Sequence, residues 1–130
     1  LGMEIVHKGK NTLPVISAFE KRFVRDNDKP SIIYGYNEGL ARFAIGPGYF
    51  VAEYDTTRGE VGINYYRVPP IGTSLPTGWP AVKTNEVGLQ KYVFSNMVDY
   101  LRKLSKHVVI GRAYKANKAT PNYFILVRRD

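Results

Sequence analysis

The sequence predicts an α+β protein, with a curved antiparallel sheet of about six strands that forms a half-barrel or roll and two helices packed against it. Two observations lead to this prediction. Short runs of aromatic and β-branched residues recur between glycine-containing turns, as strands of an antiparallel sheet do. Two longer segments place apolar residues three and four apart, which is typical of amphipathic helices. The expected order is one helix, four strands, a second helix and two strands.

The first helix is expected over about residues 12–25, TLPVISAFEKRFVR. Thr12 can serve as its N-cap, because a threonine hydroxyl accepts a hydrogen bond from a free N–H of the first turn. Ile16, Phe19 and Phe23 follow at intervals of three and four and predict one apolar face. The segment DNDKP then ends the helix, because a proline disfavours the helical conformation of the residue before it.

Four strands in a meander are expected next, and two more close the chain. Glycine in NEG, GPG and TRG supplies the backbone conformation that the tight turns need, and the turn ANKATP separates the last two strands. Glycines within the strands at positions 35, 62 and 111 predict bends, which favours a half-open barrel. The six expected strands are residues 31–36, 40–45, 49–56, 60–68, 107–115 and 122–129.

The second helix is expected over about residues 86–106, with Asn85 as its N-cap. Its lysines and arginines lie toward the C-terminal end, where they complement the helix dipole. The expected buried stripe consists of Leu89, Val93, Met97, Tyr100, Leu101 and Leu104.

Residues 69–85 are expected to form a long loop that contains four prolines and Trp79, the only tryptophan of the chain. Loops of this length without secondary structure are uncommon in compact domains and are often functional. The prolines lower the entropic cost of ordering the loop. Trp79 therefore either pins the loop to the sheet or lines a ligand pocket.

Length and composition predict one domain over residues 1–130, with an N-terminal segment, residues 1–11, whose order is left open. The chain has no cysteine, which excludes disulfides, thiolate catalysis and cysteine-based metal sites. It also has no apolar run of the length that a membrane span or a secretory signal needs. We therefore expect a cytoplasmic protein without a transmembrane segment.

The leading functional hypothesis is a non-enzymatic domain that binds a small apolar or aromatic molecule. Whether that ligand also carries an anionic group is left open. A curved sheet can enclose a cavity, and tyrosines suit such a cavity because each has an apolar ring and a polar tip. No cofactor and no metal are expected. The expected ligand-binding residues are Tyr34, Tyr36, Tyr65, Trp79 and Arg112.

Nucleic-acid binding is an alternative, because the charge is asymmetric. Residues 1–82 hold nine basic and eight acidic residues, whereas residues 83–130 hold ten basic and three acidic ones, so the last third carries most of the net charge of +8. A localised positive field attracts phosphates, although a solvated basic face gives the same composition. The candidate contacts are Lys103, Lys106, Arg112, Lys115, Lys118, Arg128 and Arg129.

An enzyme is the third possibility. Glu53 and Asp55 alternate along one expected strand and would share a face, as paired acid and base groups do. Charges on an exposed strand give the same pattern, and the two histidines, His7 and His107, belong to no recognisable triad or metal motif. The chain has no phosphate-binding glycine loop of the kind that opens a helix.

Overall fold

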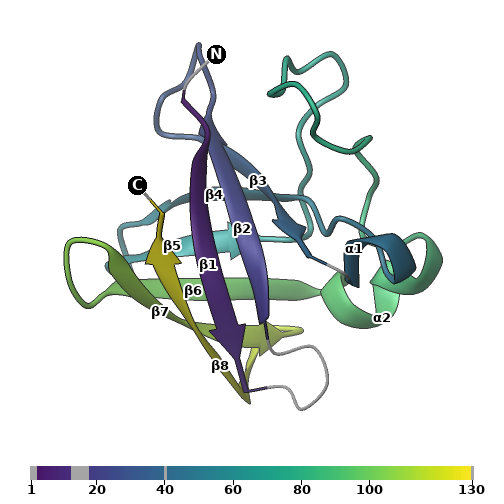
Figure 1. Cartoon of the computed structure of the whole chain (residues 1–130). Helices are drawn as coiled ribbons and strands as arrows, with labels where there is room; N and C mark the ends of the chain where they lie inside the picture. Colours follow the sequence, from purple (N-terminus) through teal and green to yellow (C-terminus); the bar gives the residue numbers. More distant parts are fainter. Residues whose placement is uncertain (1–2, 13–17, 40, 130) are drawn as a thin grey trace.

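The computed structural model shows a closed barrel of eight antiparallel strands in which each strand pairs with its neighbours along the chain (Figure 1). The structure describes residues 3–12, 18–39 and 41–129. β1 pairs with β2 on one side and with β8 on the other, which closes the barrel. The strands are β1 (Ile5–Asn11), β2 (Ala18–Arg25), β3 (Ile33–Glu38), β4 (Phe50–Asp55), β5 (Glu60–Asn64), β6 (Met97–Lys103), β7 (Val108–Lys115) and β8 (Lys118–Arg128).

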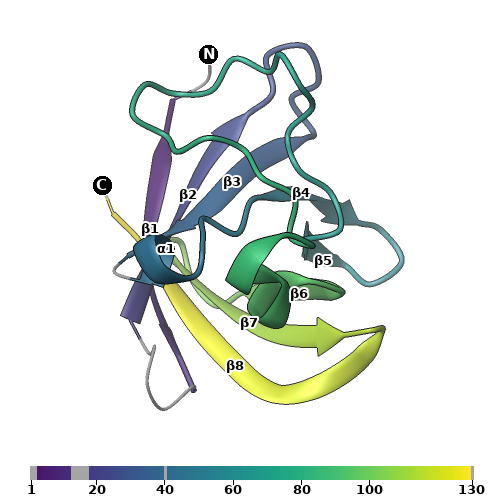
Figure 2. The ribbon, with the colours of Figure 1, turned by 90° about the vertical axis from the view of Figure 1, so that its right-hand side faces the viewer.

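The helical segments in the described part of the chain are short. α1 (Ala41–Ala44) and α2 (Lys91–Phe94) each have four residues, and a 3-10 turn, η1 (Gly88–Gln90), leads into α2. α1 and α2 both lie at the same end of the barrel (Figures 1 and 2). The prediction of an α+β fold with two helices packed on an open sheet is therefore wrong.

The prediction of a helix at residues 12–25 is wrong, because the described residues from Ala18 onward form strand β2. Phe19, Lys21 and Phe23 point into the barrel and alternate with outward-facing residues. An interval of four separates Phe19 from Phe23, and four is a multiple of the strand period as well as near the helical one. The lysine between them hid the alternation, because a charged residue is rarely buried.

The helix expected at residues 86–106 is wrong for a similar reason. The helical part ends at Phe94, and Asn96 has a left-handed backbone with a φ of 57°. Strand β6 follows, in which Asp99 is buried in the position where a strand pattern calls for an apolar residue. Leu89 and Leu104, both expected in the buried stripe, are 59% and 60% exposed.

The remaining elements agree better with the sequence. Strands lie at three of the four meander segments and at both C-terminal segments, whereas the strand expected at residues 40–45 is instead the short helix α1. The connection of β7 to β8 is tighter than expected, since Ala116 and Asn117 alone form a turn with positive φ angles. The N-terminal segment contributes strand β1, and residues 13–17 lie outside the described residues.

Three glycines give the barrel interior room for phenylalanine rings. In each case the glycine faces a phenylalanine directly across a strand pair, and the ring lies over the glycine. A Cβ at any of these glycines would come within 2.2–2.4 Å of the ring of its partner. Such pairs are a known way to keep a strongly curved sheet packed. The three pairs are Gly9–Phe19, Gly35–Phe50 and Gly111–Phe124.

We expect Gly35→Ala to lower the free energy of unfolding by about 1–3 kcal/mol or more, because the new methyl overpacks the core. The methyl would lie 2.5 Å from the backbone oxygen of Arg22, which cannot move aside as a side chain can. Gly62→Ala is the matched control in strand β5, since its Cβ would meet nothing closer than 3.5 Å. Urea unfolding of both variants measures the difference, and equal stabilities would contradict this account of the glycines.

Candidate ligand-binding site

A cavity of about 420 Å³ occupies the end of the barrel at which α1 and α2 lie, and residues of both helices line it. Residues from the ends of β1, β2, β3, β6, β7 and β8 line it together with residues of both helical segments. Its surface is mainly apolar, and the volume is in the range of small-molecule sites. The principal apolar side chains are Phe19, Tyr92, Val93, Phe94, Met97 and Phe124.

A buried polar cluster forms the floor of this cavity. Lys21 and Asp99 lie two to three residues inward from the strand ends at the mouth and are 3% and 2% exposed. The Lys21 Nζ donates to Asn37 Oδ1 at 2.8 Å and to the Tyr65 hydroxyl at 2.6 Å, and it lies 3.5 Å from Asp99 Oδ2. The Tyr65 hydroxyl in turn donates to Asp99 Oδ2 at 3.3 Å. Four residues from β2, β3 and the β5–β6 region thus meet at one point.

Aromatic rings surround the Lys21 ammonium on its other sides. The centroids of four rings lie 5.2–5.4 Å from Nζ, a distance at which the negative ring faces attract a cation. Three of these rings belong to the residues that cover the barrel glycines, so the glycine–phenylalanine pairs also build the surroundings of the lysine. The four rings are those of Phe19, Phe50, Tyr65 and Phe124.

Burial dominates the acid–base properties of the cluster. It lowers the pKa of Lys21, and the charge of Asp99 offsets part of this effect. It raises the pKa of Asp99 against the opposing charge and hydrogen bond of Lys21 and the hydrogen bond of Tyr65. It also raises the pKa of Tyr65 well above its usual value, with the charge of Asp99 adding to the shift. The phenol therefore keeps its proton and remains a donor to Asp99.

Asn37 fixes the cluster where two strands separate. β3 and β4 pair only at Ile33, Tyr34 and Gly35, after which α1 and its flanking turns lie between them. The Asn37 side chain spans this gap, since its Nδ2 donates to Gly48 O at 3.0 Å and to the Tyr65 hydroxyl at 3.2 Å. The same side chain therefore holds the wall of the cavity and accepts from Lys21.

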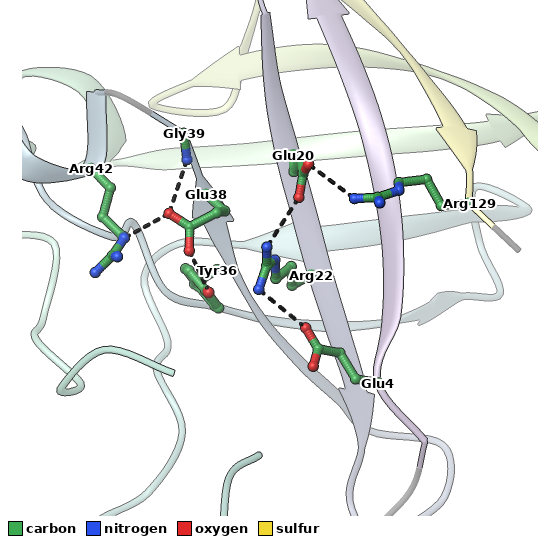
Figure 3. Close-up of polar contacts among 8 residues, drawn as sticks. All are labelled: Glu4, Glu20, Arg22, Tyr36, Glu38, Gly39, Arg42 and Arg129. Atoms are coloured by element: carbon green, nitrogen blue, oxygen red, sulfur yellow. Dashed lines mark hydrogen bonds and ion pairs between the residues drawn. The ribbon is translucent and has the colours of Figure 1, made fainter. Parts of the chain in front are cut away.

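The mouth carries charged groups of both signs (Figure 3). Glu38 accepts hydrogen bonds from the Tyr36 hydroxyl, the Arg42 Nε and the Gly39 N–H at 2.7–3.1 Å, which ties α1 to β3. Burial opposes the ionisation of Glu38, but these three hydrogen bonds outweigh it and hold its pKa below the usual value. On the opposite wall, Lys115 donates to the backbone oxygen of Ser95.

α2 lies over the floor and adds to the apolar wall. The Phe94 ring stacks on Tyr65 with centroids 5.2 Å apart and an interplanar angle of 18°. Asn85, which is fully buried, holds the preceding chain in place by donating from Nδ2 to the backbone oxygens of Tyr49 and Tyr65. Asn85 was expected to cap a helix and instead joins the end of the long loop to the barrel.

Of the five residues predicted to bind a ligand, only Tyr65 lines the cavity. Tyr34 and Tyr36 alternate with the inward-facing Gly35 and Asn37 and so lie on the outer face of β3. Trp79 packs edge-on against Tyr36, with centroids 4.8 Å apart, and it packs with Leu75 of the same loop against the outer cluster. The structure therefore places Trp79 where it pins the long loop to the outside of the barrel.

Arg112, the fifth predicted residue, lies in a separate hollow of about 300 Å³ on the outer face of β5 to β8. Its guanidinium lies 5.0 Å from the Tyr123 ring, and it pairs across strands with Tyr100 and Tyr123. Arg58 stacks on Tyr100 at 3.8 Å at the edge of the same hollow. The structure thus separates Arg112 from the cavity floor.

The seven basic residues proposed for nucleic acid do not share one surface. Lys103 and Lys106 lie at one end of the β6–β7 hairpin, and Lys115 and Lys118 lie at the other, roughly 20 Å away at strand geometry. Arg129 donates to Glu20 at 3.2 Å (Figure 3). Arg128 is opposite His7 across the β1–β8 pair, and only Arg112 lines the outer hollow.

The acidic pair proposed for catalysis lies outside the cavity. Glu53 and Asp55 share the outer face of β4 with Val51, and Glu53 forms a 2.7 Å ion pair with Arg67. Asp55 accepts from the backbone N–H of Arg58 and so stabilises the β4–β5 turn. Among residues 3–12, 18–39 and 41–129, no group of three or more histidine and acidic side chains is placed to hold a metal ion.

Sequence reasoning missed the two charged residues that make the floor. Lys21 and Asp99 each stand in a strand between apolar residues at the period of two, in FEKRF and MVDYL. A charged residue in the inward register of a strand is the signal that could have located them, but both segments were assigned to helices.

We expect Lys21→Met and Asp99→Leu each to lower the free energy of unfolding by about 3–5 kcal/mol, because each leaves a buried charge without its partner. The double variant should lose clearly less than the sum of the two, since it removes both charges. The control is the exposed pair Arg67–Glu53, whose corresponding variants should cost less than about 1 kcal/mol. Additive losses at Lys21 and Asp99 in urea unfolding would argue against a coupled pair.

Comparison of the chain with protein-family models, with curated proteins and with solved structures found no significant match. In the described part of the chain, no helix is both long and apolar enough to cross a lipid bilayer. The functional argument therefore rests on the fold and on the geometry of the site. Closed eight-stranded barrels often hold one small molecule, because their interior is just wide enough for it.

Proposed function

We propose that this protein binds one small, mainly apolar or aromatic molecule inside the barrel. The observation that carries the proposal is the cavity of about 420 Å³ with an apolar wall and a buried polar floor. Rings and aliphatic side chains would contact the body of the ligand, and a few fixed polar groups at the floor would orient it, as in many small-molecule sites. The end of the barrel beyond the floor is packed with side chains such as Phe23, Phe50 and Ile63, so the ligand would enter from the side of α1 and α2.

Non-enzymatic binding fits the arrangement of the cluster. The Lys21 ammonium donates to two neighbours and contacts four rings, so its contacts are those of a positioned structural group. The two outer carboxylates proposed as catalytic residues lie away from this cavity. An anionic group on the ligand would be placed best at the mouth, near Arg42 and Lys115.

Filling part of the cavity should weaken binding without unfolding the protein. Ala113 is 7% exposed and lines the cavity, so Ala113→Leu would place its added atoms in the space that the ligand occupies. We expect at least a tenfold loss of affinity for alkylphenols and medium-chain alcohols in isothermal titration calorimetry, with the unfolding midpoint unchanged or raised. Ala119→Leu makes the same change at an exposed position of the adjacent strand and should bind as the parent does. Equal binding by all three proteins would place the ligand elsewhere.

A second candidate function is binding of single-stranded nucleic acid at the outer hollow. Tyr100, Arg112 and Tyr123 form a row across β6, β7 and β8, and Arg58 stacks at its edge. Aromatic rings and guanidinium groups on a sheet face suit stacked bases and phosphates. Glu60 pairs with Arg58 and Arg102 there, which lowers the net positive charge of the hollow.

If this second function holds, Arg112→Gln should weaken binding of a fluorescent oligothymidylate. It should also make the slope of log affinity against log salt concentration shallower by about the amount that one phosphate contact contributes. Arg67→Gln is the matched control, because Arg67 is a half-exposed arginine that lines neither cavity. Fluorescence anisotropy at two salt concentrations distinguishes the variants. Absence of binding at low salt, or equal losses in both variants, would reject this surface.

A further inference from the structure

We propose that the buried end of the ligand carries a neutral hydrogen-bond donor, a hydroxyl or phenol, which donates to Oδ1 of Asp99. This inference rests on the proposed function and adds the chemical class and the orientation of the ligand. It depends on three features of the floor, which are a carboxylate oxygen without a donor, neighbouring polar groups that satisfy one another, and a cation already beside the carboxylate.

The first feature is Oδ1 of Asp99. The Asp99 side chain lines the cavity and is almost fully buried, and its Oδ2 faces the Tyr65 hydroxyl and the Lys21 ammonium. Its Oδ1 is also buried and accepts no hydrogen bond from the residues that the structure describes. Buried carboxylate oxygens normally have a donor, because an unpaired one loses its hydration without compensation. A ligand that brings a donor to this oxygen would therefore gain more than one that does not.

The second feature is the saturation of the neighbouring groups. The Lys21 ammonium donates to Asn37 Oδ1 and to Tyr65, and it lies in ion-pair range of Asp99. The Asn37 amide donates to Gly48 O and to the Tyr65 hydroxyl. A ligand that offered only an acceptor to the floor would have to break one of these contacts. Oδ1 of Asp99 is thus the polar atom of the floor that has no partner among the described residues, and it is an acceptor.

The third feature is the local charge. An ammonium on the ligand would come close to Lys21, whose Nζ lies 3.5 Å from the other oxygen of the same carboxylate. A carboxylate on the ligand would face Asp99 itself, and like charges in a buried site repel strongly. A neutral hydroxyl avoids both costs. An anionic group therefore belongs at the other end of the ligand, near the cations of the mouth, Arg42 and Lys115.

The test compares three ligands of one shape on the parent protein. 4-Butylphenol carries the donor, 4-butylanisole replaces it with an ether that only accepts, and butylbenzene carries no polar group. We expect 4-butylphenol to bind about tenfold to a hundredfold more tightly than either of the others, from the value of a hydrogen bond to a charged group. Isothermal titration calorimetry or competition against a bound dye measures the three affinities.

Variants locate the donor's partner. The double variant Lys21→Met/Asp99→Leu replaces the pair by apolar side chains, and in it the advantage of 4-butylphenol over butylbenzene should disappear or reverse. The ligand series on the parent protein tests the proposal without any variant. Met97→Leu is the control, because it changes only the apolar wall and should shift all three affinities by a similar factor.

The outcomes separate this inference from the proposed function. Equal binding of the three ligands by the parent protein, with loss of all three in Ala113→Leu, would overturn the donor assignment and leave the cavity as the binding site. A preference for 4-butylphenol that persists in the double variant would also overturn it, because the donor would then pair with another group. Failure of all three ligands to bind would overturn both proposals.

Discussion

The ion pair between Lys21 and Asp99 determines what the interior of this barrel can hold. An eight-stranded barrel has room for one layer of side chains or one small ligand, and here a charged pair occupies its centre. Two buried charges are tolerated only when their remaining positions are satisfied, so Tyr65 and Asn37 must lie within hydrogen-bond distance of them. The cluster thereby divides the interior into a packed part beyond it and a cavity on the side of the helices.

The glycine–phenylalanine pairs and the lysine depend on one another. Each glycine allows a ring to lie flat across the neighbouring strand, and Phe19, Phe50 and Phe124 in these positions also contact the Lys21 ammonium. A larger residue at the glycine would push the ring toward the ammonium or out of the barrel. The curvature of the sheet and the environment of the charge therefore have a common cause in the sequence.

The strands that the sequence predicted have apolar residues or glycine at most of the inward positions away from the mouth of the cavity. β2 and β6 were assigned to helices because their inward positions include Lys21 and Asp99, and a charged residue normally indicates the solvent side. Closure of the barrel could not be predicted either, since it requires β1, with two lysines and few strand-forming residues, to pair with the distant β8. Of the predicted ligand-binding residues, Tyr65 lines the cavity. For Trp79 the sequence left open whether it pins the loop or lines a pocket, because a large aromatic residue does not indicate which face of a sheet it covers, and the structure places it on the outside of the barrel.

Lys21 and Asp99, the buried charges that concealed strands β2 and β6 in the sequence, also form the floor of the candidate site. The two facts have a common physical reason. A periodic pattern identifies positions that serve the core, so a residue that departs from the pattern and is nevertheless buried must be held by specific partners. Lys21 donates hydrogen bonds to Asn37 and Tyr65, whereas Oδ1 of Asp99 accepts no hydrogen bond from the described residues. That single unpaired acceptor belongs to a residue that lines the cavity, whereas an interior filled by side chains alone normally pairs its buried acceptors.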